Sequence, residues 1–165
     1  MTIIPKVIAL DFDGTCVGHR FPSIGPDVGA VPVLLELVEF GHKLILSSIR
    51  SHDLSPKTRF KHGSALQDAV HWFSSKGISL YGVYLDPYQH TWTSSPKVHA
   101  DLIIDDRALG CPTIFDPNIS HRRYVNWIEV RKLLVKNEFL PAENEDVTSL
   151  THHSNSSYLN ELNIV

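Results

Sequence analysis

The chain has 165 residues, of which 42% are hydrophobic and 20% charged, and its formal net charge is −3. This composition is typical of one globular domain, and the lack of a basic excess argues against strong binding to duplex nucleic acid. The two cysteines, Cys16 and Cys111, form no CxxC pair, which argues against a disulfide framework or structural zinc site and fits a reducing cytoplasm. Because no hydrophobic run is long enough for a signal peptide or membrane span, we expect a cytoplasmic protein without a membrane partner.

Hydrophobic runs typical of buried strands alternate along the chain with stretches of helical periodicity. In chain order, the sequence predicts a strand over residues 7–11, a helix over 27–40, a strand over 43–48, a helix over 64–76, strands over 80–85, 101–106 and 113–115, and a helix over 124–135. Asp27 and Gly41 are expected to bound the first helix, whose first turns must accommodate Pro32, and Gly77 is expected to end the second.

This alternation predicts an α/β fold, because strand–helix–strand crossovers are right-handed and build a parallel sheet that is covered on both faces. We therefore expect a three-layer α/β/α sandwich with a Rossmann-like parallel sheet, forming one catalytic domain over residues 1–140. Residues 141–165 are rich in Asn, Ser, Glu and Thr, and we expect them to form a polar tail that is mobile or loosely docked.

Polar residues cluster at the carboxyl ends of three predicted strands, which is where parallel sheets carry their active sites. The first cluster is Asp11-Phe12-Asp13-Gly14-Thr15, and the others are Ser47-Ser48 and Asp105-Asp106. Two carboxylates placed two residues apart repel each other unless a cation lies between them, and hard oxygen ligands of this kind suit Mg²⁺. The alternative is a pair of aspartates that only cap a loop.

The segment Asp11-Phe12-Asp13-Gly14-Thr15 resembles the first motif, hhhDxDGT, of the haloacid dehalogenase (HAD) superfamily. Ser48-Ile49-Arg50 resembles the second motif, Lys97 the third and Asp105-Asp106 the acidic fourth, so the four motifs follow in order between residues 11 and 106. HAD enzymes commonly insert a cap domain in one of two places, which correspond here to residues 15–25 and 86–96 and are only loop-sized. The chain therefore resembles a small capless subgroup of HAD phosphatases.

The resemblance implies a Mg²⁺-dependent phosphomonoester hydrolase in which Asp11 attacks phosphorus and forms an aspartyl-phosphate. It implies that Asp13 is the general acid and then the general base, and that Ser48 and Lys97 help the metal to neutralise the transferring phosphoryl group. The implied metal ligands are the side chains of Asp11 and Asp106, the backbone carbonyl of Asp13, and Asp105 either directly or through water.

Other residues near these motifs are candidate substrate contacts, each with an alternative. Strand alternation points only one of Ser47 and Ser48 at the site, and the Ser-x-Arg resemblance favours Ser48. Arg50 could bind a phosphate oxygen or pair with a carboxylate. The remaining candidates are Gly14 and Thr15 in the first motif, and His19 and Arg20 in the loop that follows, for which the alternative is a solvated loop.

The sequence does not specify the phosphorylated substrate. The first alternative is a nucleotide or nucleic-acid-end phosphatase, which the basic stretches at residues 57–62 and 121–124 favour and the net negative charge opposes. An alternative of another class is a non-catalytic phosphate-binding protein with the HAD fold. Because a capless site is open, we expect it to be completed either by a large substrate or by a neighbouring subunit of a homo-oligomer.

Overall fold

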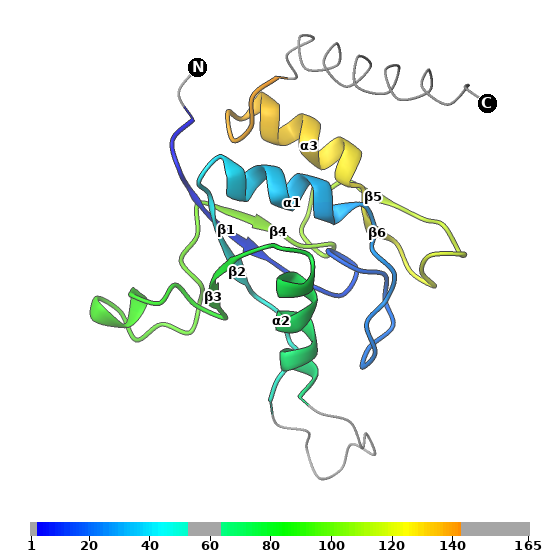
Figure 1. Cartoon of the computed structure of the whole chain (residues 1–165), viewed down its shortest axis with the longest axis horizontal. Coiled ribbons are helices and arrows are strands. Elements are labelled where there is room, and N and C mark those ends of the chain that lie inside the picture. Colours follow the sequence, from blue (N-terminus) through cyan, green and yellow to red (C-terminus); the bar gives the residue numbers. More distant parts are fainter. Residues whose placement is uncertain (1–2, 53–63, 143–165) are drawn as a thin grey trace, which may run out of the picture.

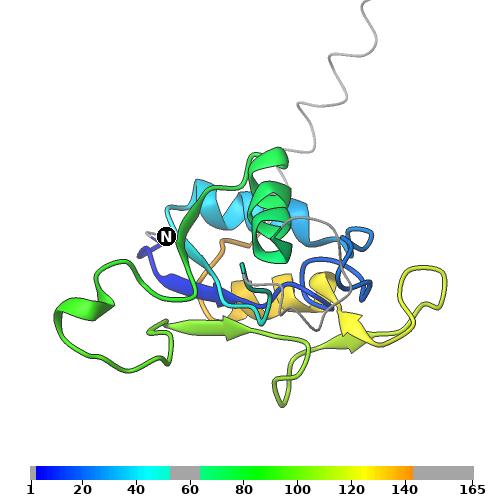
Figure 2. The ribbon, with the colours of Figure 1, turned by 90° about the horizontal axis from the view of Figure 1, so that it is seen from below.

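The computed structural model describes residues 3–52 and 64–142, and its centre is a sheet of four parallel strands (Figure 1). In spatial order β3-β2-β1-β4, the strands are Leu80–Val83, Lys43–Leu46, Val7–Leu10 and Leu102–Ile104. All three neighbouring pairs are parallel, and Figure 2 shows β1 and β4 side by side and pointing the same way. The predicted α/β class with a Rossmann-like parallel sheet is therefore confirmed.

Within the described residues, three α-helices accompany the sheet, and each begins close to its predicted position. They are α1 (Ala30–Glu39), α2 (Ala65–Ser75) and α3 (Trp127–Lys136). The Ser64 hydroxyl caps α2 by accepting a hydrogen bond from the backbone N–H of Gln67 at 3.1 Å. At α1 the N-cap is Gly29, and the carboxylate of Asp27 accepts from the backbone N–H of Ala30 at 3.1 Å. After α1 and α2 the chain turns at Gly41 and Gly77, whose φ angles of 83° and 72° favour glycine.

The segment after β4 differs from the prediction. Residues Thr113–Ile114 form β5, but this strand pairs antiparallel with β6, Tyr124–Val125, in a separate two-stranded sheet. The predicted helix over residues 124–135 therefore begins only at Trp127, with the Asn126 side chain accepting from the backbone N–H of Glu129. Tyr124 and Val125 are both buried, and a buried apolar pair fits a strand as well as a helix.

One face of the sheet carries the hydrophobic core. Alternate strand residues, Ile8 and Leu10 in β1 and Leu44 and Leu46 in β2, form one cluster with buried side chains from all three helices. Helices α1 and α3 lie side by side (Figure 1), joined by the ion pair between Glu36 and Arg131. The three helices thus pack into a single core together with this face.

The opposite face is covered more thinly than a full helical layer would cover it. Ala9 and Ile45 are fully buried there, whereas Ile103 of the edge strand β4 is 47% exposed. Between β3 and β4, the crossover contains only a short 3-10 helix, η1, Gln89–Thr91. This crossover, which the structure describes throughout, therefore contributes no α-helix to a second layer.

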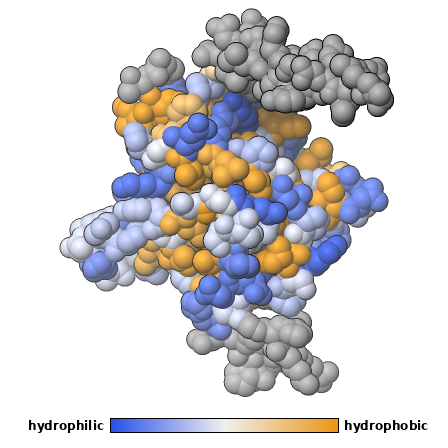
Figure 3. All heavy atoms as spheres, in the orientation of Figure 1, coloured by the Kyte–Doolittle hydropathy of each residue, from blue (hydrophilic) through white to orange (hydrophobic). Residues whose placement is uncertain are grey.

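The described surface mixes hydrophobic and hydrophilic side chains, as the face in Figure 3 illustrates. Within residues 3–52 and 64–142, no helix is long and apolar enough to span a bilayer. Most of the predicted tail, residues 143–165, and the basic stretch at residues 57–62 lie outside the described residues.

Candidate functional site

Three carboxylates from the ends of two neighbouring strands meet at one edge of the sheet. Because β1 and β4 are adjacent and parallel, with the Asp11 N–H bonded to the Ile104 carbonyl at 3.0 Å, Asp11 comes to lie beside Asp105 and Asp106. One carboxylate oxygen from each of the three lies within 4.8 Å of the others. In addition, Oδ1 of Asp106 is buried and has no hydrogen-bond partner. This donor set, all oxygen and incompletely satisfied, fits a hard divalent cation such as Mg²⁺.

The electrostatics of the cluster favour such a cation. Burial raises the pKa of Asp11 from 3.8 to about 7, with further raising by the charges of Asp105 and Asp106. Burial also raises the pKa of Asp106, while the neighbouring His19 acts in the opposite direction. Desolvated carboxylates held this close together are stabilised in their ionised form by a positive ion between them.

Thr15 and Gly14 lie in close contact with residues of the carboxylate cluster and with His19. Thr15 is fully buried, and its hydroxyl donates to Asp11 Oδ2 at 3.2 Å and accepts from the backbone N–H of Asp106 at 3.1 Å. Gly14 has a φ angle of 87°, and a Cβ there would lie 2.3 Å from Nε2 of His19. The Thr15 hydroxyl thus holds the Asp11 carboxylate and the Asp106 backbone together, and the expected role of Gly14 and Thr15 as substrate contacts stays a prediction.

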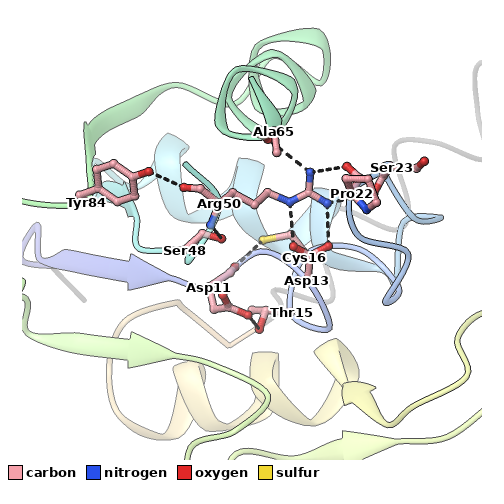
Figure 4. Close-up of polar contacts among 10 residues, drawn as sticks. All are labelled: Asp11, Asp13, Thr15, Cys16, Pro22, Ser23, Ser48, Arg50, Ala65 and Tyr84. Atoms are coloured by element: carbon pink, nitrogen blue, oxygen red, sulfur yellow. Dashed lines mark hydrogen bonds and ion pairs between the residues drawn. The ribbon is translucent and has the colours of Figure 1, made fainter. Parts of the chain in front are cut away.

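Asp13 is held by Arg50 rather than by the carboxylate cluster. Both Asp13 oxygens accept from the guanidinium, from Nε and Nη2, at 2.7 Å each (Figure 4). The other Arg50 N–H groups donate to the backbone carbonyls of Pro22, Ser23 and Ala65. Arg50 is fully buried, and all five of its N–H directions are used. Of the two roles open to Arg50 from the sequence, the structure selects the carboxylate pair and leaves no donor for a phosphate.

The segment after β2 supplies the third side of the site. Ser47 and Ser48 both line a hollow of about 440 Å³ together with Asp11, Asp13 and Asp105. The Ser48 hydroxyl accepts a hydrogen bond from the backbone N–H of Arg50 at 3.2 Å. Because both serines line the hollow, the structure does not distinguish which of them would contact a phosphate.

Lys97 is not brought to this site. It is exposed, and it lines a different hollow beside η1, where its carbonyl accepts from the Gln89 side chain at 2.7 Å. Lys97 lies before the amino end of β4, whereas the carboxylates lie beyond its carboxyl end. The basic residues that do line the carboxylate hollow, among the described residues, are His19, Arg107 and Arg122.

His19 lies directly against the cluster. Its Nε2 is 3.2 Å from Asp106 Oδ2 and 3.2 Å from the Arg123 carbonyl, and its ring packs against His121. Since both partners of Nε2 are acceptors, this nitrogen carries the proton. Arg20, the next residue, faces a second hollow that shares His19 with the first. Arg107 and Arg122 were not candidates from the sequence, although Arg107 directly follows the acidic motif.

Comparisons with known proteins give one informative match. No family model and no curated protein matches the sequence. The chain is similar to the solved structure of a conserved protein from Bacteroides thetaiotaomicron, with 30% sequence identity and a TM-score of 0.59. The match covers 81% of this chain and 92% of that protein, so the likeness extends over nearly the whole of the bacterial chain.

Proposed function

We propose that this chain, which belongs to the same family as the conserved Bacteroides thetaiotaomicron protein, is a Mg²⁺-dependent phosphomonoester hydrolase of the HAD superfamily. The observation that carries the proposal is the convergence of Asp11, Asp105 and Asp106 at the carboxyl ends of β1 and β4. The HAD superfamily is proposed because the first, second and fourth sequence motifs lie at this site, whereas Lys97 of the third does not. The 30% identical relative adds a bacterial protein with a similar fold.

Asp11 is the proposed nucleophile. One of its carboxylate oxygens attacks phosphorus, the bond from phosphorus to the ester oxygen breaks, and an aspartyl-phosphate forms. Water then attacks this phosphorus, the bond to Asp11 breaks, and inorganic phosphate leaves. The Thr15 hydroxyl, 3.2 Å from Asp11 Oδ2, restricts the carboxylate so that its other oxygen is the one available for attack.

Mg²⁺ would be held by Asp11, Asp106 and Asp105, and when bound it would offset the negative charge on the phosphoryl oxygens. The unpartnered Asp106 Oδ1 is the strongest sign of this fit, since a buried carboxylate oxygen without a donor is costly unless a cation binds it. His19 fixes the other oxygen of Asp106 and so orients the carboxylate.

Asp13 is the proposed general acid and base, and its hydrogen bonds from Arg50 affect how it can bind a proton. Asp13 must give a proton to the leaving oxygen and later take one from water. Both of its oxygens accept from Arg50, so a proton on either oxygen displaces one of these two hydrogen bonds. We infer that the Arg50 contact loosens at one oxygen during turnover while the other keeps Asp13 in place.

Asp11→Asn tests the proposal. The amide keeps the shape of the side chain but cannot attack phosphorus, so hydrolysis of p-nitrophenyl phosphate should fall by at least about a thousandfold. Asp68→Asn, which removes an exposed carboxylate from α2, is the matched control and should retain activity. Removing divalent cations with a chelator should stop turnover, and Mg²⁺ should restore it better than Ca²⁺. Near wild-type turnover by Asp11→Asn would sink the mechanism.

A non-catalytic phosphate-binding protein is the second candidate. The engagement of both Asp13 oxygens by Arg50 and the remote position of Lys97 favour it. The two functions separate in a single-turnover experiment with phosphate-ester substrates in excess Mg²⁺. Binding of inorganic phosphate without release of any alcohol would favour the binding protein, whereas phosphate trapped on Asp11 in an Asp13→Asn variant would favour the enzyme.

A further inference from the structure

A second hollow adjoins the carboxylate site. It measures about 600 Å³ and is lined by residues 19–21 and 117–122. It shares His19, Phe21 and Arg122 with the hollow that holds Asp11 and Asp13, so the two hollows are adjacent. Its ionisable lining residues are Arg20, Arg122 and two histidines, and no carboxylate lines it. This neighbouring space is therefore cationic, although the whole chain has a net charge of −3.

The arginines of the described chain divide into two groups. Arg50, Arg123 and Arg131 have guanidinium groups bound to Asp13, Thr113 and Glu36, respectively. Within residues 3–52 and 64–142, the guanidinium groups of Arg20, Arg107 and Arg122 have no hydrogen bond or ion pair. These three are the ones that line the two hollows. A guanidinium group without a protein partner can bind phosphate oxygens through two parallel N–H groups, and three such groups line these two adjacent hollows.

The walls of the second hollow are held together by one buried hydroxyl. Ser120 is 4% exposed, and its Oγ accepts from the backbone N–H of His19 at 3.1 Å and from that of Arg122 at 3.3 Å. The loop that follows the first motif is thereby tied to the loop before β6. Gly18 packs closely against the same loop, since a Cβ there would lie 2.7 Å from the Ile119 carbonyl. Arg20 and Arg122 consequently project from backbones that are fixed relative to each other.

From this geometry we infer that the second hollow is a subsite for another phosphate group of the substrate, bound between Arg20 and Arg122. The inference rests on the proposed function, because it places the transferred phosphoryl group beside Asp11. The substrate class is then a phosphomonoester whose organic part carries a second phosphate, either a small bisphosphate or the phosphorylated end of a nucleic acid. Both sources present the same phosphate oxygens to Arg20, so the chemistry is shared and the test separates them.

The test is a binding measurement that does not depend on turnover. Calorimetry in Mg²⁺ compares adenosine 3′,5′-bisphosphate, adenosine 5′-monophosphate and a short 5′-phosphorylated oligonucleotide, all in the Asp11→Asn background so that none is consumed. At least one ligand with a second phosphate should bind about tenfold or more tightly than the monophosphate. Arg20→Gln should remove most of that preference, while Lys132→Gln, which removes an exposed cation from α3, should leave it intact.

Each outcome bears on the inference. Tighter binding of the bisphosphate assigns the subsite to small bisphosphates, and tighter binding of the oligonucleotide alone assigns it to nucleic-acid ends. Equal affinity for all three ligands overturns the inference, as does a preference that Arg20→Gln and Lys132→Gln lower equally. If no phosphate ester is ever hydrolysed, the proposed function fails while the binding preference still stands or falls by this measurement.

Discussion

Arg50→Met is expected to destabilise the protein strongly. The substitution removes two charge-assisted hydrogen bonds to Asp13 and three donors to backbone carbonyls. Breaking a buried ion pair by deleting one partner costs about 3–5 kcal/mol, because the remaining charge stays in a desolvated place. Asp13 keeps 16% of its side chain exposed and so can recover some hydration, which limits the loss. We therefore expect the free energy of unfolding to fall by about 3–5 kcal/mol.

Urea unfolding followed by circular dichroism measures this loss. The matched control is Arg131→Met, which also breaks a two-point arginine–carboxylate contact, with distances of 2.7 and 2.8 Å to Glu36. That pair is about one-quarter exposed, so its loss should cost about 1 kcal/mol or less. Equal losses for the two variants would refute the reasoning, since burial is the property that distinguishes the two pairs.

Two further predictions concern the carboxylate cluster and the excluded lysine. Since burial raises the pKa of folded Asp11 from 3.8 to about 7, the metal-free folded form keeps a proton that the unfolded chain loses, and stability from this group should fall as pH rises between these values. Mg²⁺ competes with that proton, so the apparent affinity of the protein for Mg²⁺ should weaken about tenfold for each pH unit below 7. In Asp11→Asn, a Mg²⁺ titration at several pH values should show a weaker dependence of this affinity on pH. Lys97→Ala should change kcat/KM by less than about twofold, because Lys97 lines a different hollow; a drop of a hundredfold in steady-state assays would return the lysine to the site.

The parallel sheet could be predicted because its strands are short hydrophobic runs bounded by charge and turns. The predicted strand over residues 7–11 differs from β1 by one residue, whereas that over 101–106 contains β4 but extends beyond it into Asp105 and Asp106, which follow the strand. The strand predicted over residues 113–115 corresponds to β5, but its antiparallel partner β6 could not be predicted, since two residues are too few to show a period of two. Backbone contacts fix β6 instead: the N–H of Val125 donates to the Gly14 carbonyl at 2.8 Å.

The carboxylate cluster could be predicted because adjacent parallel strands bring their carboxyl ends to one edge. The partner of Arg50 could not, because its contact with Asp13 spans 37 residues and depends on the loop at Pro22 and Ser23 folding back over the guanidinium. The position of Lys97 could not be predicted either, because it depends on the course of the irregular loop between η1 and β4. Sequence spacing therefore located the groups at the ends of regular strands and His19 in the loop after the first motif, and missed contacts that depend on loops distant in sequence.

The two loops at which HAD enzymes commonly insert a cap domain differ in their contribution to the carboxylate hollow. Residues 86–96 contribute no lining residue to the carboxylate hollow, whereas the loop after the first motif contributes His19 and Phe21. The segment before β6, which has no counterpart among the expected cap positions, contributes Arg122 to both hollows. A capless enzyme must draw binding energy from parts of the substrate remote from the reacting phosphate. Basic residues line the hollow beside the carboxylates, so under the proposed function a second phosphate of the substrate would supply this energy without a neighbouring subunit.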